Sequence, residues 1–230
     1  MDALFAPFEA GTTDRPFVIA QLGQSLDGRI ATLSGDSKYI NGASALDHLH
    51  RLRARVDAVV VGVGTVVADD PLLTVRRVGG RNPARVVLDP SGRVPAQARC
   101  LRRDGAERIV VCREEAKAPQ APETLRLASD GCFMCPRAIV AALGRRGFRR
   151  LLIEGGARTI SRFIDAGCVD RLHVLVAPLI FGSGKPALDL KPIGAVSEAL
   201  RPTAQVHVLP GGDVLFDCDL RRPASEVRNP

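Results

Sequence analysis

Tryptophan is absent from this 230-residue sequence, and tyrosine occurs once, at Tyr39. Proteins that bind single-stranded nucleic acid stack the bases on aromatic side chains, so the chain lacks the usual platform for that function. It also lacks an uncharged apolar run approaching the ~18 residues that cross a bilayer. We therefore expect neither nucleic acid nor a membrane among its partners.

A secretory signal is also missing, because the first residues contain no basic segment followed by a sustained apolar one. We therefore expect a cytoplasmic location. The six cysteines are scattered, as is typical of reduced thiols. Cys132 and Cys135 have a spacing that zinc and redox sites use, but no second such pair and no histidine at ligand spacing accompany them. We expect no bound metal.

The positive charge of the chain comes mainly from arginine, since four residues are lysines and the formal net charge is +7. A basic balance attracts phosphorylated small molecules and nucleic acid alike, and the arginines are spread along the chain rather than gathered in one block. The length suits one domain with a large core. We predict a single domain over residues 15–220, with terminal tails at 1–14 and 221–230.

Apolar runs of strand length alternate with helical patterns along most of the chain. Near-continuous runs of Val, Ile and Leu are typical of strands covered on both faces of a parallel sheet, and two further strands flank a turn at residues 210–213. The fold class is therefore α/β, with a mostly parallel central sheet flanked by helices and a C-terminal antiparallel hairpin. The expected strands lie at 16–22, 57–63, 84–89, 108–113, 150–156 and 170–182, and the expected helices at 43–56, 136–147 and 157–167.

The segment "LLIEGGARTISRF" joins a strand to a helix through two glycines. Ligands of open α/β sheets bind beyond the carboxyl ends of the strands, where this junction delivers Glu154. The free amides of a helix start attract phosphate, and Gly155 and Gly156 allow a close approach. A plain strand-to-helix turn is the alternative.

The stretch "VVVGVGTVVADDP" contains a Gly-x-Gly after a strand, but a dinucleotide fingerprint of the Rossmann type needs a small residue where Val67 stands. The adjacent Asp69 and Asp70 project in different directions, so one is free to cap the turn while the other meets a ribose or an amine. Adjacent carboxylates do not make a standard metal or acid/base pair.

Other polar residues that follow strands are weaker candidates. Ser91 and Arg93, in "LDPSGRVP", suit a ribose phosphate, and a surface turn is the equal alternative. The segment 23–42 is too rich in glycine for a helix and is a candidate flap over a ligand. His48 and His50 are expected on the polar side of a helix, so neither is a candidate catalyst.

Several motifs together resemble the reductase domain of the bifunctional riboflavin-biosynthesis deaminase/reductase and its stand-alone relatives. They are "SLDGRIA", "SGDSKYI", "LRARVDAVVVGVGTVVADDPLLTVR", "NPARVVLD", "LLIEGGA" and "DRLHVLVAPLIFGSG", spread over residues 15–220. The resemblance implies a dihydrofolate-reductase-like fold, NADPH as cofactor, and hydride transfer to C1′ of the ribosylamino group of a phosphorylated pyrimidinone. It also implies a homodimer, to which the apolar region 172–181 would contribute.

The resemblance assigns site residues as well. Arg53 and Arg76 would hold the substrate phosphate, and Glu154 would orient the polar ring or ribose. Glu154 and Asp27 are the candidate catalytic residues. Cofactor contacts are implied at Gly23, Tyr39, Thr65, Asp69, Ser91, Gly155, Gly156, Ala157, Arg158, Thr159, Ile160, Ser161 and Arg162, and substrate contacts at Ser37, Arg53, Leu73, Arg76 and Glu154.

The chain departs from the family pattern at two positions. Gln21 stands where members commonly have a lysine, and Tyr39 where they have a tryptophan. A related reductase acting on a pterin or another heterocycle therefore stays open, as does a non-catalytic module that binds a nucleotide or nucleic acid. The zinc deaminase signature, His-x-Glu followed by Pro-Cys-x-x-Cys, is absent, so we expect no deamination.

Overall fold

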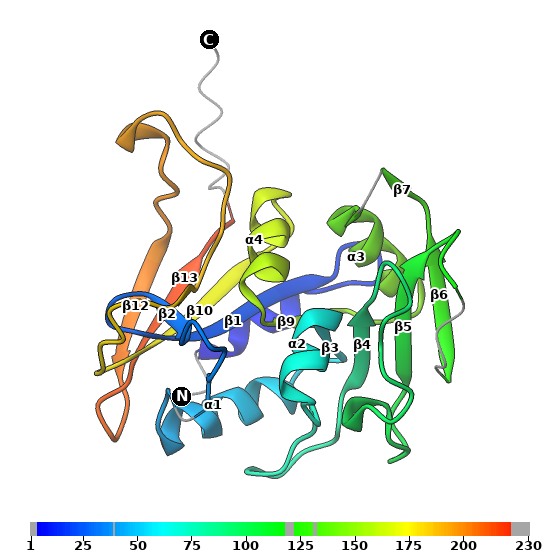
Figure 1. The fold of residues 1–230 in the computed structure, drawn as a ribbon, viewed down its shortest axis with the longest axis horizontal. Helices are drawn as coiled ribbons and strands as arrows, with labels where there is room; N and C mark the ends of the chain where they lie inside the picture. Colours follow the sequence, from blue (N-terminus) through cyan, green and yellow to red (C-terminus); the bar gives the residue numbers. More distant parts are fainter. Residues whose placement is uncertain (1–3, 39, 118–121, 131–132, 222–230) are drawn as a thin grey trace.

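A nine-stranded sheet with helices on both faces forms the body of the molecule (Figure 1). The computed structural model describes residues 4–38, 40–117, 122–130 and 133–221. The strand order is β12-β13-β10-β1-β9-β3-β4-β5-β6. In chain order these strands are β1 (Phe17–Ser25), β3 (Ala58–Gly62), β4 (Ala84–Leu88), β5 (Arg108–Arg113), β6 (Glu123–Leu127), β9 (Arg150–Glu154), β10 (Arg171–Ala177), β12 (Thr203–Val208) and β13 (Val214–Asp219).

Four α-helices and two short ribbons complete the described part of the chain. The helices are α1 (Ala43–Arg53), α2 (Val63–Asp69), α3 (Pro136–Arg145) and α4 (Ala157–Asp165). The ribbons pair β2 (Arg29–Ala31) with β11 (Lys185–Pro186) and β7 (Ser129–Asp130) with β8 (Phe133–Met134). Three 3₁₀ turns lie at Ala6–Ala10, Arg99–Leu101 and Val196–Glu198.

The sheet confirms the predicted class. Strands β10, β1, β9, β3, β4, β5 and β6 pair in parallel, whereas β13 runs antiparallel to β10 and pairs with β12 as the predicted C-terminal hairpin. Each predicted helix begins at its expected residue. Strand β6 has no counterpart in the sequence prediction, because Glu123–Leu127 is half-exposed and carries two charged residues. No helix in the described ranges is long and apolar enough to span a bilayer.

The two faces of the sheet support separate cores. Val18, Ala20 and Val60 point to the face covered by α3 and α4, where they meet Ile139 and Phe163. The residues between them in the strands point to the opposite face, under α1 and α2. Both faces are therefore buried, which explains the continuous apolar runs of the central strands.

The N-terminal segment is part of the domain rather than a tail, so the prediction for residues 1–14 is wrong from Leu4 onward. Phe5 and Phe8 are buried in the α1 face of the sheet, and Phe8 is 1% exposed. Phe8 packs on Phe17 of β1 with ring centroids 5.7 Å apart. Burying two aromatic side chains offsets the entropy lost in ordering the segment. Residues 222–230 of the predicted C-terminal tail lie outside the described residues.

A buried polar network lies beneath this segment. His48 Nε2 is 3.0 Å from His173 Nδ1, and His173 Nε2 is 3.2 Å from an Asp217 carboxylate oxygen. Arg171 donates two hydrogen bonds to the same carboxylate. The placement of His48 and His50 on a polar helix side was wrong, since each is 3% exposed. Burial, together with the neighbouring His173 and Arg51, lowers the pKa of His48 to about 3.

The neutral His48 makes folding pH-dependent. Its folded pKa of about 3 lies below the ordinary histidine value of 6.5, so the unfolded chain binds the extra proton as the pH falls. We expect the free energy of unfolding to decrease from about pH 7.5 to about pH 5, above the ordinary carboxylate range. His48→Gln should flatten this slope by up to about 1.4 kcal/mol per pH unit. Urea unfolding at several pH values measures it, and equal slopes for both proteins would contradict this role.

Candidate active site

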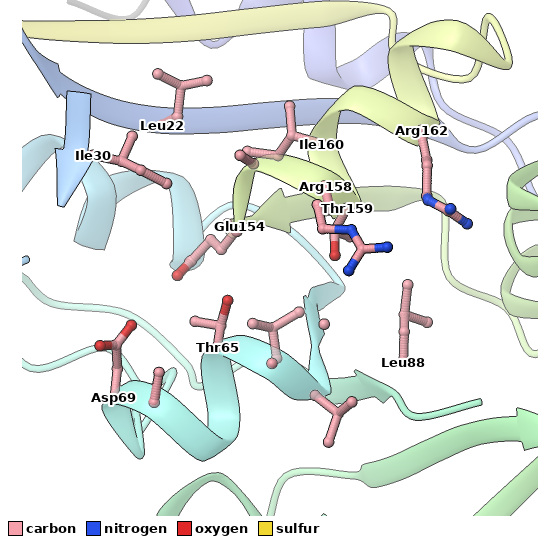
Figure 2. Close-up of a pocket in the computed structure, with 18 of the residues that line it drawn as sticks. Leu22, Ile30, Thr65, Asp69, Leu88, Glu154, Arg158, Thr159, Ile160 and Arg162 are labelled. Atoms are coloured by element: carbon pink, nitrogen blue, oxygen red, sulfur yellow. The ribbon is translucent and has the colours of Figure 1, made fainter. Parts of the chain in front are cut away.

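A cavity of about 760 Å³ opens at the carboxyl ends of the central parallel strands (Figure 2). Its walls come from the ends of β1, β3, β4 and β9, from α2 and the start of α4, and from the β2–β11 ribbon. Successive parallel strands end at the same edge, so residues far apart in the chain converge there. The volume is typical of sites for small molecules and cofactors.

The start of α4 faces α2 across this cavity. Gly156 is the N-cap residue of α4, and no side chain caps the helix there. A Cβ on Gly62 would lie 2.5 Å from Thr159 Oγ1, and one on Gly156 would lie 3.3 Å from Thr65 Oγ1. Gly155 has φ +44°, in the left-handed region that favours glycine. The glycines therefore let the two helix starts approach while the first amides of α4 stay open to a ligand.

Glu154 lies at the inner wall of the cavity, held by Arg53 at the end of α1. Arg53 Nε and Nη2 donate to the two carboxylate oxygens at 2.7 and 2.6 Å, and Nη1 donates to the Thr74 carbonyl at 3.1 Å. The side chains are 7% and 10% exposed. Burial alone would lower the pKa of Arg53, but the charge and hydrogen bonds of Glu154 raise it above its ordinary value. Arg53 therefore stays protonated beside the carboxylate.

The structure does not bring the two predicted phosphate arginines to the cavity wall. Arg53 donates hydrogen bonds to Glu154 and Thr74, so it orients the Glu154 carboxylate. Arg76 does not line the cavity, and its Nη1 donates to Thr74 Oγ1 at 2.7 Å. Burial lowers the pKa of Arg76, and nearby Arg53 and Arg99 lower it further.

The adjacent aspartates separate as expected. Asp69 lines the cavity and accepts a hydrogen bond from Ser37 Oγ at 3.4 Å. Asp70 adopts φ 41° at the end of α2, and its carboxylate accepts a bond from Arg99 N at 2.7 Å. Figure 2 shows Thr65 and Asp69 on α2 and Glu154 at the end of β9 directed toward the same space.

Asp27, Ser91 and Ser161 lie away from the cavity lining. Ser25 Oγ donates to the Asp27 carboxylate at 2.6 Å, and Phe181 N and Gly182 N donate to it at 3.1 and 2.8 Å; these bonds lower its pKa. Asp27, predicted as a catalytic residue, therefore fixes the loop after β10 and does not line the cavity. Ser161 is buried and accepts a bond from Asp189 N at 2.7 Å. In the segment after β4, Pro90 and Arg93 line the cavity, whereas Ser91 does not.

Most of the predicted residues do converge on the cavity, whereas Tyr39 lies outside the described residues. The predicted residues that line it are Gly23, Ser37, Thr65, Asp69, Leu73, Glu154, Gly155, Gly156, Ala157, Arg158, Thr159, Ile160 and Arg162. The prediction missed Ile30, Ala31, Met134, Ile139, Lys185 and Pro186. The ribbon residues among these sit in strands of two or three residues, which leave no periodic signal.

One end of the cavity combines apolar and positively charged side chains, among them Leu88, Arg158 and Arg162. Ile139 and Arg93 also line the cavity. Figure 2 shows Arg158 and Arg162 extending from α4 into the same space, opposite Leu88. Burial lowers the pKa of Arg162, and the charge of Arg158 lowers it further, so an anion placed between them would relieve their repulsion. The same two arginines border a second cavity of about 510 Å³.

The fold and cavity define an α/β domain with a ligand site at the carboxyl edge of a parallel sheet, beside an uncapped helix start. The chain belongs to the RibD C-terminal domain family, whose model matches residues 16–208. Among the described residues, no three or more His, Cys, Asp or Glu side chains are grouped to hold a metal ion.

Two curated relatives show how far the similarity extends. The chain is 38% identical over 194 residues to the riboflavin biosynthesis protein RibD of Aquifex aeolicus, covering 83% of this chain and 54% of that protein. The chain thus spans about half the length of this relative. It is 34% identical over 213 residues to the 2,5-diamino-6-ribosylamino-4(3H)-pyrimidinone 5′-phosphate reductase of Methanothermobacter thermautotrophicus, covering 88% of this chain and 97% of that protein.

Solved structures support the same fold. The deaminase/reductase of Thermotoga maritima superimposes with a TM-score of 0.76 at 31% identity, covering 95% of this chain and 60% of that one. A dihydrofolate reductase from Enterococcus faecalis superimposes with a TM-score of 0.53 at 12% identity, covering 89% and 97% of the two chains. The second comparison confirms a dihydrofolate-reductase-like fold, and at this identity it says nothing about the activity.

Removing Arg53 should destabilise the domain, because Glu154 would remain buried without its partner. We expect Arg53→Met to lower the free energy of unfolding by about 3–5 kcal/mol, and Arg53→Met combined with Glu154→Gln to recover part of that loss. Arg77→Met is the control, since it breaks an exposed pair with Asp47 that contributes at most about 1 kcal/mol. Urea unfolding measures all three, and equal losses for the two single variants would show that Arg53 is not a structural partner of Glu154.

Proposed function

We propose that this protein is an NADPH-dependent reductase of a phosphorylated ribosylaminopyrimidine in riboflavin biosynthesis. The main support for the proposal is that one cavity is lined both by the open start of α4 and by the Glu154 carboxylate. A phosphate-binding helix start and a polar acceptor in one cavity suit a cofactor beside its substrate. The name of the Methanothermobacter relative, with which the chain aligns over nearly its full length, supports the same reaction.

The residues of the site fit this chemistry through positioning. Thr65 and Thr159 flank the amides that would hold the diphosphate. Glu154, oriented by Arg53, would accept a hydrogen bond from the pyrimidine ring or the ribose. When bound, NADPH supplies the hydride that reduces C1′ of the sugar imine to the ribitylamino product. The β2–β11 ribbon covers this part of the cavity and would keep water from the imine.

The choice of NADPH over NADH rests on the arginines at the apolar end. An adenine between Leu88 and Ile139 would bring its ribose within the field of Arg93, Arg158 and Arg162. A ribose phosphate is the dianion that such guanidinium groups bind most strongly. The described cysteines are free thiols, which supports the cytoplasmic location predicted from the sequence.

The activity is tested by following cofactor oxidation at the nicotinamide absorbance. We expect turnover with the ribosylaminopyrimidine phosphate and NADPH, and none with a dihydropterin. Turnover with the dihydropterin but not with the ribosylaminopyrimidine phosphate would show that the substrate is a pterin. Stabilisation of the protein by single-stranded nucleic acid, without any by NADPH, would defeat the enzyme proposal.

The arginine end of the cavity gives a sharper cofactor test. Arg162→Gln should weaken NADPH binding by about 10- to 100-fold, the range of a lost charge-assisted hydrogen bond, and leave NADH binding unchanged. Arg137→Gln is the control, because Arg137 is exposed on α3 and borders neither cavity. Titration of nicotinamide fluorescence gives both dissociation constants. An equal loss for NADH would place Arg162 away from the extra phosphate.

We also propose that the protein forms a homodimer through the uncovered face of the C-terminal hairpin. Val174 of β10 pairs with Phe216 of β13, which pairs with Val206 of the edge strand β12. Val206, Val208 and Phe216 are 57%, 75% and 37% exposed. This apolar row includes part of the region 172–181 predicted from the sequence and continues onto the hairpin.

Charge placed on this face should separate the subunits. We expect Phe216→Asp to convert a dimer into a monomer, because an interface carboxylate would be desolvated without a partner. Val67→Asp places the same charge on an exposed residue of α2 that does not line the cavity, and should leave the mass unchanged. Light scattering after size exclusion measures the mass; a dimeric Phe216→Asp protein would exclude this face as the interface.

A further inference from the structure

Lys185 lines the cavity from the short strand β11, and nothing in the proposed reaction has given it a role. Its backbone is fixed opposite Ala31 of β2. A Cβ on Gly184 would lie 2.5 Å from the Ala31 carbonyl, and Ala187 N donates to the Gly28 carbonyl at 3.0 Å. The close backbone approach on either side of Lys185 places its side chain over the cavity.

The segment that follows Lys185 is attached to α4. Asp189 N donates a hydrogen bond to Ser161 Oγ at 2.7 Å, and Lys191 N donates one to the Asp165 carboxylate at 3.3 Å. Lys185 and the first residues of α4, Ala157 and Arg158, line the same cavity. The side chain of Lys185 and the open helix start therefore border one space for a ligand.

The ammonium group has no partner that neutralises it within the described part of the chain. No hydrogen bond or ion pair of Lys185 Nζ occurs there, whereas the Arg53 charge is taken up by Glu154. The Lys185 ammonium group lies beside Gly35, because a Cβ added to Gly35 would be 3.3 Å from Nζ. Gly35 has φ +98° and also lines the cavity. A glycine at this turn thus leaves room for the lysine.

We propose that Lys185 binds a phosphate group of the ligand in front of α4. The argument rests on the proposed function for the identity of that ligand. An ammonium on a flexible stem and the open amides of a helix start are complementary to the same anion from two sides. The ribose phosphate of NADPH is assigned above to the arginines, which leaves two candidates in the proposed reaction, the diphosphate of the cofactor and the 5′-phosphate of the substrate. The Lys185 ammonium group would bind either phosphate in the same way, so an experiment must distinguish the two.

The test compares Lys185→Gln, Lys185→Arg and the control Lys117→Gln, which removes an exposed charge outside the cavity lining. Each protein is titrated with NADPH and assayed with the phosphorylated substrate and with its dephosphorylated nucleoside. We expect Lys185→Gln to raise either the Kd for NADPH or the KM for the phosphorylated substrate by about 10- to 100-fold. The kcat and the KM for the nucleoside should stay within twofold of the control, and Lys185→Arg should restore most of the affinity.

The two readouts identify the phosphate. A raised Kd for NADPH assigns Lys185 to the cofactor, and a raised KM for the phosphorylated substrate alone assigns it to the substrate. The proposal would be overturned if both the Kd and the KM were unchanged. It would also be overturned if, at saturating NADPH, the KM for the nucleoside rose as much as the KM for the phosphorylated substrate. A wild-type protein that binds NADPH but does not reduce the pyrimidine would refute the proposed substrate, while the cofactor titration would still decide the role of Lys185.

Discussion

The buried pair of Arg53 and Glu154 is the constraint on which the geometry of the site depends. It joins the last residue of α1 to the last residue of β9, which are 101 positions apart in the chain. An ionised carboxylate at the inner wall of an apolar cavity is costly unless its charge is matched there. The guanidinium supplies that match and fixes both carboxylate oxygens, so the acceptor that faces the ligand has one orientation.

A second constraint places the starts of α2 and α4 around this acceptor. Gly62 and Gly156 allow α2 and α4 to begin within contact distance of each other, with Thr159 and Thr65 filling the space that side chains would occupy. Larger residues would push the helix starts apart. The separation between the open amides and Glu154 is therefore set where the glycine backbone packs against threonine side chains. Such close packing gives the rigidity that a precisely positioned site requires.

The sequence predicted the parts of the fold and site that local patterns encode. Continuous apolar strands and capped helical patterns predicted the parallel sheet, and "EGGA" predicted the strand-to-helix turn that carries Glu154. The sequence could not show that the Arg53 guanidinium is paired with Glu154, because this ion pair depends on where α1 ends relative to β9 in space. His48 was misplaced for the same reason, since the N-terminal segment with Phe5 covers a helix side that looks polar in isolation.

The β2–β11 ribbon shows why the remaining wall of the cavity escaped prediction. The segment 23–42 was expected to be a flap, but the structure pins it through Asp27 to the loop after β10 and through Ala31 to Lys185. Strands this short gain their stability from tertiary contacts, so neither periodicity nor propensity marks them. The carboxylate of Asp27 joins two segments that are 154 positions apart, because Phe181 N donates a hydrogen bond to it. A residue that the sequence marked for chemistry thus also has a structural contact, one that depends on where the loop after β10 lies in space and that no local pattern encodes.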